Sequence, residues 1–207
     1  ESIWEMIAIR DGGLAIYGGV IAGFLTAYLF SRRRKISFWA LADCCVQGLF
    51  IGQAIGRWGN FMNREAHGAV TDSFFKMGLM DASGAVTYYH PTFLYESVWN
   101  LVGFLALHFL TKKRKFDGQI FLSYLTWYGL GRVWIEGLRT DSLYLFSTGI
   151  RVSQLVAALC VVIGGGALAF MLIKRKPDPA QLYVNQKAAR EAEAAQEDAE
   201  AEKPENL

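Results

Sequence analysis

The sequence has few of the residues from which metal centres and redox sites are built. It contains three cysteines and three histidines among 207 residues. Two of the cysteines, Cys44 and Cys45, are adjacent, and adjacent cysteines rarely form a disulfide with each other. No CxxC or mixed His/Cys spacing indicates zinc or haem. A phosphate-binding loop and a GxSxG nucleophile elbow are also missing. We therefore expect no metal and no cofactor.

What the chain does contain is an excess of apolar side chains. Hydrophobic residues make up 53% of the sequence and aromatic residues 14%, with a mean hydropathy of +0.21. One soluble core of this length normally buries less apolar surface, which argues against an ordinary soluble enzyme. The chain starts at Glu1 without a signal-peptide pattern, so we expect a fragment of a longer protein.

Five apolar runs are long enough to cross a bilayer as helices, and they predict an all-α, polytopic membrane bundle. They are residues 14–30, 36–55, 91–110, 119–135 and 150–173. Each is close to the roughly 17 to 25 residues that span about 30 Å of hydrocarbon. The second run contains Asp43, Gln47 and Gln53, which also fits a tilted or re-entrant element. Buried helices of a soluble protein are the alternative, but these usually show a polar face.

Three basic clusters set the expected direction of the spans. Residues 32–35, 112–115 and 174–176 follow the first, third and fifth runs, so an alternating path places them all on one side. Short basic loops stay on the cytoplasmic side, which puts the N-terminus outside and the C-terminus in the cytoplasm. Basic runs also bind nucleic acid, but beside apolar helices they indicate topology anchors, and we expect no nucleic-acid partner.

The C-terminal segment differs from the rest of the chain in composition. Residues 177–207 hold eight acids and three bases, with few large apolar residues. We therefore divide the chain into a membrane domain, residues 1–176, and a cytoplasmic acidic tail, residues 177–207. The composition favours disorder for this tail, with a helix as the alternative.

Polar residues in or beside the spans gather at the opposite, outer face. The connection at residues 56–68 carries two arginines, two asparagines, a glutamate and a histidine among aromatics and glycines. At the outer end of the fourth run, Arg132, Glu136 and Arg139 follow the spacing i, i+4, i+7. On a helix these three side chains share a face, which predicts a charge ladder.

Charges next to lipid are costly unless they are paired or functional. The three arginines Arg57, Arg132 and Arg139 face two obvious acids, Glu65 and Glu136, which leaves positive charge for an anion. A guanidinium group suits bidentate contact with phosphate, and at a membrane surface the most available phosphate belongs to a lipid headgroup. A purely structural ion-pair network is the alternative.

Three further side chains are candidates for the same site. Tyr17 fits either this site or an interfacial aromatic belt, and His90 fits either the site or the start of a span. Glu96 lies inside an apolar run and needs a partner in either interpretation, with Arg57 or Arg132 as candidates.

The outer segments resemble one known family. Residues 56–68 fit the pattern Gly-Arg-x-Gly-Asn-Phe-x-Asn-x-Glu-x-x-Gly, which is similar to the signature of bacterial prolipoprotein diacylglyceryl transferases. Further similar segments follow in family order: Gly12-Gly13, Gly18-Gly19, His90-Pro91-Thr92-Phe93-Leu94-Tyr95-Glu96 and Tyr128-Gly129-x-Gly131-Arg132-x-x-x-Glu136-x-x-Arg139. The resemblance covers residues 1 to about 176. Family members have seven spans, so we expect this chain to lack the first two helices.

The resemblance implies an enzyme of the bacterial cell membrane with its active site towards the outer face. It would transfer the diacylglyceryl group of phosphatidylglycerol to the lipobox cysteine thiol of a prolipoprotein signal peptide, forming a thioether and releasing glycerol phosphate. The implied catalytic residues are Arg57, Arg132, Glu136 and Tyr17. The implied phosphatidylglycerol-binding residues are Arg57, Asn60, Asn63, Glu65, Gly68, Tyr128, Arg139 and His90.

Two points about this function stay open in the sequence. Tyr17 stands where many family members have a histidine, so the base that removes the thiol proton is Tyr17, His90 or a carboxylate. The alternative function is a lipid or small-anion transporter that uses the same arginines. It is disfavoured because the polar residues collect at one face and no two-fold internal repeat is apparent. A structural membrane subunit is the third possibility.

Overall fold

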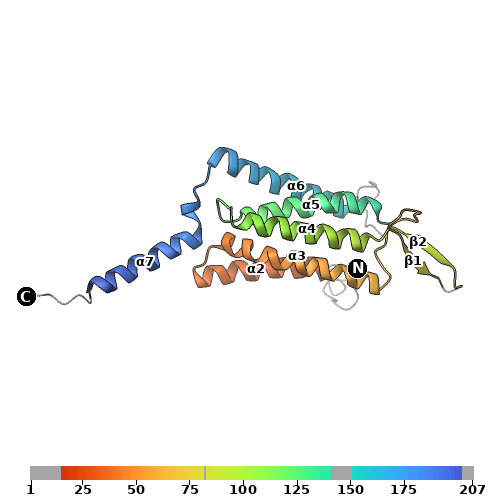
Figure 1. The fold of residues 1–207 in the computed structure, drawn as a ribbon, viewed down its shortest axis with the longest axis horizontal. Helices are drawn as coiled ribbons and strands as arrows, with labels where there is room; N and C mark the ends of the chain where they lie inside the picture. The colour runs from red at the N-terminus through yellow and green to blue at the C-terminus, as the bar shows by residue number, and fades with distance from the viewer. Residues whose placement is uncertain (1–14, 82, 141–150, 202–207) are drawn as a thin grey trace, which may run out of the picture.

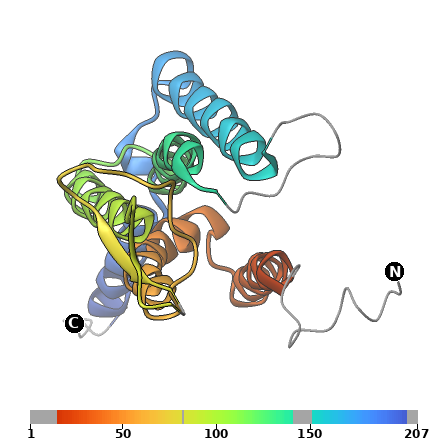
Figure 2. The same ribbon diagram turned by 90° about the vertical axis from the view of Figure 1, so that its right-hand side faces the viewer.

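The structure is a computed structural model and describes residues 15–81, 83–140 and 151–201. Within these ranges, a bundle of long helices has a two-stranded hairpin at one end and a helical tail at the other (Figure 1). Seen along the bundle from the hairpin end, α2 lies beside α3, and α6 lies beside α5 (Figure 2). The bundle helices are α2 (Ala15–Arg34), α3 (Phe38–Met62), α4 (Thr92–Thr111), α5 (Gln119–Leu138) and α6 (Val152–Phe170), which continues into the π-helical turn η2 (Met171–Arg175).

Three of the described helices are long and apolar enough to cross a membrane, namely Phe38–Met62, Thr92–Thr111 and Val152–Arg175. They correspond to the predicted runs at residues 36–55, 91–110 and 150–173. The other two predicted runs coincide with α2 and α5. α5 carries more polar side chains, among them Gln119, Ser123 and Glu136, which are buried where α5 packs against α3, α4 and α6. The helical fold is confirmed, whereas the count of five spans stays a prediction.

The second predicted run forms one continuous helix, α3, which extends beyond its expected end at residue 55. It starts at Ser37, whose side chain accepts a hydrogen bond from the Ala40 N–H at 3.3 Å. At the other end, the rings of Trp58 and Phe61 pack against Phe93 at the start of α4, with ring centroids 5.4 and 4.8 Å away. This packing keeps the last turns helical, so the arginine-containing segment expected in a connection begins on a helix.

The acid inside this run, Asp43, caps another helix. Its carboxylate is buried and accepts hydrogen bonds from the N–H groups of Gly118 and Phe121, both at 2.9 Å. The first N–H groups of a helix have no partners within the helix, and they favour a negative charge. Asp43 therefore fixes the first turn of α5. The run itself is one continuous helix, while a tilted or re-entrant path in the membrane stays a prediction.

The helices α4 and α5 approach closely through a pair of tryptophans. Trp99 and Trp127 stack with ring centroids 4.6 Å apart. Each indole N–H donates to the backbone carbonyl of the other residue, at 3.0 Å in both directions. A Cβ added at Gly131 would lie 2.2 Å from Trp99 Nε1, so only glycine leaves room for this pair. The two helices are thus held at a fixed separation beside Arg132, the arginine of α5.

The connection between α3 and α4 contains a β-hairpin that the all-α prediction did not include. Strand β1 (Met77–Met80) pairs antiparallel with β2 (Val86–Tyr89), from Met77 opposite Tyr89 to Met80 opposite Val86. In the turn, Asp81 Oδ1 accepts hydrogen bonds from the Ser83 N–H, the Ser83 hydroxyl and the Ala85 N–H at 2.8, 2.6 and 3.0 Å. Asx turns of this kind offer the backbone an alternative to helix, which explains the local structure.

The acidic tail forms a helix in the structure, where its composition favoured disorder. A short 3-10 turn, η3 (Pro179–Gln181), leads into α7 (Tyr183–Ala201), which extends away from the bundle (Figure 1). Alanine, glutamate and glutamine are good helix formers, which accounts for the helical alternative. The start of α7 is tied to the bundle because the Tyr183 N–H donates to Asp117 Oδ2 at 2.9 Å and Leu182 is buried.

Candidate functional site

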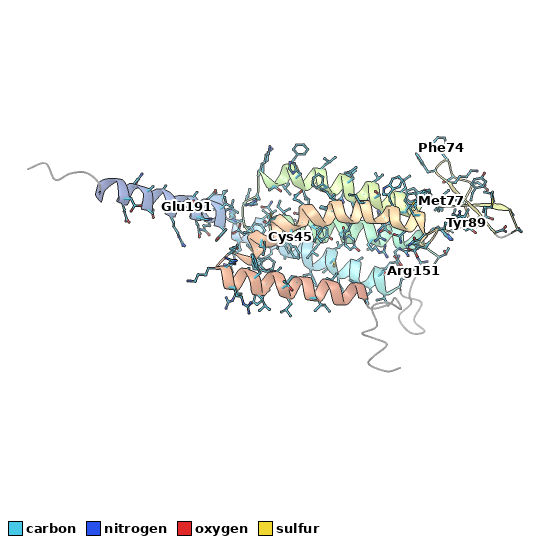
Figure 3. All side chains as sticks on the ribbon, turned by 90° about the horizontal axis from the view of Figure 1, so that it is seen from below. Cys45, Phe74, Met77, Tyr89, Arg151 and Glu191 are labelled. Atoms are coloured by element: carbon cyan, nitrogen blue, oxygen red, sulfur yellow. The ribbon has the colours of Figure 1, made fainter. Side chains whose placement is uncertain are left out.

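The sequence-predicted arginines come together at the hairpin end of the bundle, opposite the end that carries the three basic clusters (Figure 1). Three helices supply the cluster: Arg57 lies in the last turns of α3, Glu96 in the second turn of α4, and Arg132 and Glu136 near the end of α5. Figure 3 shows Arg151 at the same end as Met77 and Tyr89 of the hairpin, whereas Cys45 lies towards the other end.

Glu96 is the centre of this cluster. Its Oε2 lies 2.6 Å from Arg57 Nε, and its Oε1 lies 2.7 Å from Arg132 Nη1 and 3.9 Å from Arg139 Nη1. The glutamate side chain is 7% exposed, and the three arginine side chains are 24%, 15% and 12% exposed, respectively. One buried carboxylate thus holds guanidinium groups from two helices and from the residue that follows α5.

Arg132 is fixed from two sides. In addition to Glu96, it contacts Glu136 one helical turn further on, with 2.8 Å between Arg132 Nη2 and Glu136 Oε2. The Glu136 side chain is almost fully buried, and its backbone carbonyl accepts a hydrogen bond from Arg151. Arg132 thus donates a hydrogen bond to Glu96 at 2.7 Å and also lies against the carboxylate of Glu136, which places its guanidinium group between two acids.

The predicted charge ladder on α5 is correct for the pair Arg132–Glu136 and wrong for its continuation to Arg139. Arg132 and Glu136 pair at the spacing i, i+4, but α5 ends at Leu138 and Arg139 has extended backbone angles of φ −80° and ψ 147°. Arg139 leaves the helix because its backbone forms an antiparallel bridge with Gly68 in the α3–α4 connection. Its side chain consequently reaches Glu96 on α4 instead of continuing along α5.

Glu65 does not have the position that the sequence interpretation gave it. Its Oε1 accepts hydrogen bonds from the side-chain amides of Asn60 and Asn63, both at 3.1 Å. It connects to the arginines only through Asn60, whose Oδ1 accepts from Arg57 Nη1 at 3.4 Å. The two asparagines are therefore oriented by Glu65, while the direct partner of the arginines is Glu96. The sequence named Arg57 and Arg132 as candidate partners of Glu96, and both contacts are confirmed.

The backbone around Glu65 makes a sharp turn. Arg64 and Ala66 have φ values of +57° and +54°, a conformation that side-chain-bearing residues rarely adopt. Strained conformations of this kind persist where the surrounding structure holds them, and they cluster at functional sites. The turn brings Glu65 back over the end of α3, towards Asn60.

Gly68 lies where three chain segments meet. Its N–H donates to the His90 carbonyl at 2.9 Å, and the next N–H, from Ala69, donates to the Leu138 carbonyl at 3.1 Å. A Cβ at Gly68 would lie 2.6 Å from the His90 Cβ and 2.9 Å from the Leu138 oxygen. Gly68 is thus required for packing, and it positions the segment that carries Arg139.

The remaining predicted residues lie around the cluster. His90 Nδ1 lies 3.3 Å from the Tyr95 hydroxyl, with ring centroids 6.2 Å apart. Tyr128 lines a small cavity together with Glu96 and Arg132. The side chain of Tyr17 lies outside the described residues, so its predicted role stays a prediction. Among the residues that the structure describes, no group of three His, Cys, Asp or Glu side chains could hold a metal ion.

The fold and this cluster define a helical membrane protein with arginines gathered around buried carboxylates at one end of the bundle. The model of the prolipoprotein diacylglyceryl transferase family matches residues 1–171, and the chain belongs to this family.

Similar proteins carry the name phosphatidylglycerol–prolipoprotein diacylglyceryl transferase. The chain is 47% identical over 186 residues to that of Listeria innocua serovar 6a, covering 86% of this chain and 66% of the relative. It is 45% identical over 196 residues to that of Lysinibacillus sphaericus, covering 90% and 71%. It is 45% identical over 194 residues to that of Enterococcus faecalis, covering 88% and 68%. The chain thus spans about two thirds of the length of these relatives.

Proposed function

We propose that this chain carries the headgroup site of a phosphatidylglycerol:prolipoprotein diacylglyceryl transferase in the bacterial cell membrane, with the site towards the outer face and the C-terminus in the cytoplasm. The observation that carries the proposal is the arginine cluster around Glu96, because Arg57 and Arg132 come from different helices and share one carboxylate. Family membership and the names of the relatives support the same reaction.

The substrates follow from this chemistry. Phosphatidylglycerol would place its phosphate against Arg57, which is the more exposed of the two arginines, and against Arg132. Asn60 and Asn63 would donate to headgroup oxygens, in an orientation that Glu65 sets. The second substrate is the lipobox cysteine of a prolipoprotein signal peptide, which lies in the same bilayer.

The reaction makes one carbon–sulfur bond and breaks one carbon–oxygen bond. The cysteine thiolate attacks the glyceryl carbon, and the bonding electron pair leaves with the phosphate oxygen of glycerol phosphate. Negative charge grows on the departing phosphate, so arginines held in place beforehand stabilise the transition state more than the bound lipid. Glu96 and Glu136 have the positioning role, since they fix the guanidinium planes.

The attacking group must first lose its proton. A free cysteine thiol has a pKa of about 8.5, so a base is needed near neutral pH. We assign this step to Tyr17 or His90. The variants Tyr17→Phe and His90→Gln distinguish the two, because loss of the base is relieved at pH 9, where the thiol ionises by itself. The variant whose transfer rate recovers between pH 7 and pH 9 identifies the base.

Transfer itself is tested with the intact protein in proteoliposomes that contain labelled phosphatidylglycerol and a lipobox peptide. The expected product is a thioether-linked diacylglyceryl peptide, and the expected loss for Arg57→Ala or Arg132→Ala is at least about a hundredfold. The variant Lys76→Ala is the matched control, because it removes an exposed cation at the same end of the molecule. Normal transfer by both arginine variants would refute the phosphate site, and lipid movement without a thioether product would indicate a transporter.

A further inference from the structure

A small cavity lies between α4 and α5, next to the Arg132–Glu96 ion pair. Its volume is about 10 Å³, which is enough for one water-sized group. Charged and polar side chains form part of its wall, namely Glu96, Asn100, Tyr128 and Arg132. Trp99 of the stacked tryptophan pair and Ile135 also line it, so the cavity lies within the helix contact and is small because that contact is tight.

Asn100 lines this cavity but has no part in the ion pairs of the arginine cluster. It lies one turn after Glu96 on α4 and is 3% exposed. Its Oδ1 is fully buried and has no hydrogen-bond partner among the residues that the structure describes. A buried acceptor without a partner is destabilising, and native proteins satisfy nearly all such atoms with protein, water or ligand. The Asn100 oxygen therefore indicates a donor group that occupies the cavity.

The chemistry of the wall restricts what this donor can be. An anion is unsuitable, because both the Glu96 carboxylate and the Asn100 carbonyl oxygen would repel it. A hydroxyl group fits, because it donates to Asn100 while its oxygen accepts from a neighbouring donor such as the Tyr128 hydroxyl or the Arg132 guanidinium. The volume admits a single oxygen, which excludes a larger polar group.

We infer that this cavity binds one hydroxyl group and that Asn100 determines specificity for a hydroxyl-bearing headgroup. The inference rests on the proposed function. A phosphate held by Arg132 lies at the edge of the cavity, because Arg132 is itself part of the cavity wall. A glycerol headgroup on that phosphate carries hydroxyl groups within a few bonds, and Asn100 lines the same cavity as Arg132, so one hydroxyl group would have Asn100 as its acceptor. An ordered water molecule is the other source of the same chemistry.

The test compares two lipids that differ only in the hydroxyl groups, phosphatidylglycerol and phosphatidylpropanol, with the intact protein and a lipobox peptide. The wild type should prefer phosphatidylglycerol by about tenfold or more in kcat/KM, since a site built for a hydroxyl rejects the analogue that lacks it. Asn100→Leu, which keeps the branched shape of the side chain and removes the acceptor, should lose this preference through a higher KM for phosphatidylglycerol, with phosphatidylpropanol unaffected.

The controls separate this effect from a general defect. Gln47 also has a buried side-chain oxygen without a partner in the described residues, but its amide contacts Thr111 at the far end of α4 from Asn100. Gln47→Met should therefore keep the lipid preference. If Asn100→Leu unfolds at a lower temperature than wild type in detergent, Asn100→Ser provides the second variant, and it should retain part of the preference because it keeps an oxygen acceptor.

Each outcome has one meaning. An equal loss by Asn100→Leu on both lipids supports a water molecule in the cavity as the occupant. Unchanged kinetics on both lipids overturns the inference while the proposed function stands. A wild type that transfers from both lipids equally well overturns the headgroup assignment. Absence of any thioether product from either lipid with the wild type contradicts the proposed function itself.

Discussion

At the scale of single residues, one carboxylate organises the site. Glu96 contacts Arg57 and Arg132 at 2.6 and 2.7 Å and is buried. Removing one member of a buried ion pair leaves uncompensated charge, which is more damaging than the pair is stabilising. Arg57 would then also lose its orientation, so under the proposed function stability and headgroup binding would both depend on Glu96.

Glu96→Gln should therefore lower the stability and raise the KM for phosphatidylglycerol. We expect a loss of about 3 kcal/mol in stability, because the amide keeps the shape but leaves Arg57 without its acidic partner and Arg132 with Glu136 alone. Thermal unfolding in detergent and transfer kinetics measure the two effects. Asp72→Asn makes the same change at an exposed acid, 4.0 Å from Lys76, and should alter neither quantity by much. Equal behaviour of the two variants would contradict the central position of Glu96.

Arg132→Lys tests whether geometry matters beyond charge. Arg132 contacts Glu96 through Nη1 and Glu136 through Nη2, and a lysine ammonium cannot reproduce this planar fork. We expect a drop of about a hundredfold in kcat/KM for transfer, with the protein still folded by circular dichroism. Activity within a factor of two of wild type would show that the site needs only a positive charge there.

At the scale of elements, the separation of α4 and α5 decides whether the site exists. Gly131 is in contact with the ring of Trp99, and the neighbouring residue is Arg132. The sequence marks this glycine as part of a family-like motif, but no local pattern shows that a tryptophan of another helix lies against it. Tight helix contacts of this kind tolerate no added atoms, since protein interiors are close-packed.

Gly131→Ala should therefore destabilise the bundle by about 2 kcal/mol and reduce transfer, because the new Cβ pushes Trp99 and α4 away from Arg132. Gly165→Ala on α6 is the matched control, since a Cβ there would lie at an ordinary contact distance of 3.6 Å from Thr126 Cγ2. Melting temperatures of the two variants in the same detergent make the comparison. A Gly131 variant as stable as the Gly165 variant would mean that the two helices can separate without penalty.

The hairpin turn has its own pH dependence. The Ser83 hydroxyl, together with backbone N–H groups including that of Ala85, lowers the pKa of Asp81 from its usual 3.8. Because this pKa is lower in the folded turn, the carboxylate stabilises the turn above pH 3.8, and the contribution is lost as the pH falls through the lowered pKa. The protection factor of the Ala85 amide, which is its exchange rate relative to that of an unstructured chain at the same pH, should therefore stay high near neutral pH and fall in acid. Asp81→Ala should remove this acid-dependent step.

At the scale of the whole molecule, the two ends of the bundle differ in chemistry. The hairpin and the arginine cluster lie at one end, and the basic clusters and α7 lie at the other (Figure 1). If basic loops stay on the cytoplasmic side, the hairpin faces outward. This arrangement would give the site access to lipids and exported peptides in the outer leaflet.

Cysteine labelling tests this orientation. In a variant without the natural cysteines Cys44, Cys45 and Cys160, we expect Ala85→Cys in the hairpin to react with a membrane-impermeant maleimide in intact cells. Gln196→Cys on α7 should react only after the membrane is permeabilised. Both positions are exposed in the structure, so a difference between them reports the side of the membrane. The reverse pattern would overturn the proposed topology.

The helices could be predicted from the sequence because the length of an apolar run is a local property. The arginines could be singled out because charges are rare beside such runs. The sequence also named Arg57 and Arg132 as candidate partners of Glu96, because an acid inside an apolar run needs a counter-charge, and both contacts are confirmed. That both arginines share this one carboxylate, while Glu65 binds asparagines, depends on helix packing and could not be predicted. The hairpin was missed because four-residue strands have no clear periodicity, and the end of α5 was missed because Arg139 leaves the helix to pair with Gly68.

The stacked tryptophans also have an optical consequence. Two indole rings with centroids 4.6 Å apart are close enough for their electronic transitions to couple, which gives a circular dichroism signal that depends on their separation and angle. Trp99 is at the same time part of the wall of the cavity beside Arg132. A lipid headgroup that enters this region should change the coupled signal without any attached label. If phosphatidylglycerol binds as proposed, the tryptophan pair would serve as a built-in spectroscopic probe of that binding.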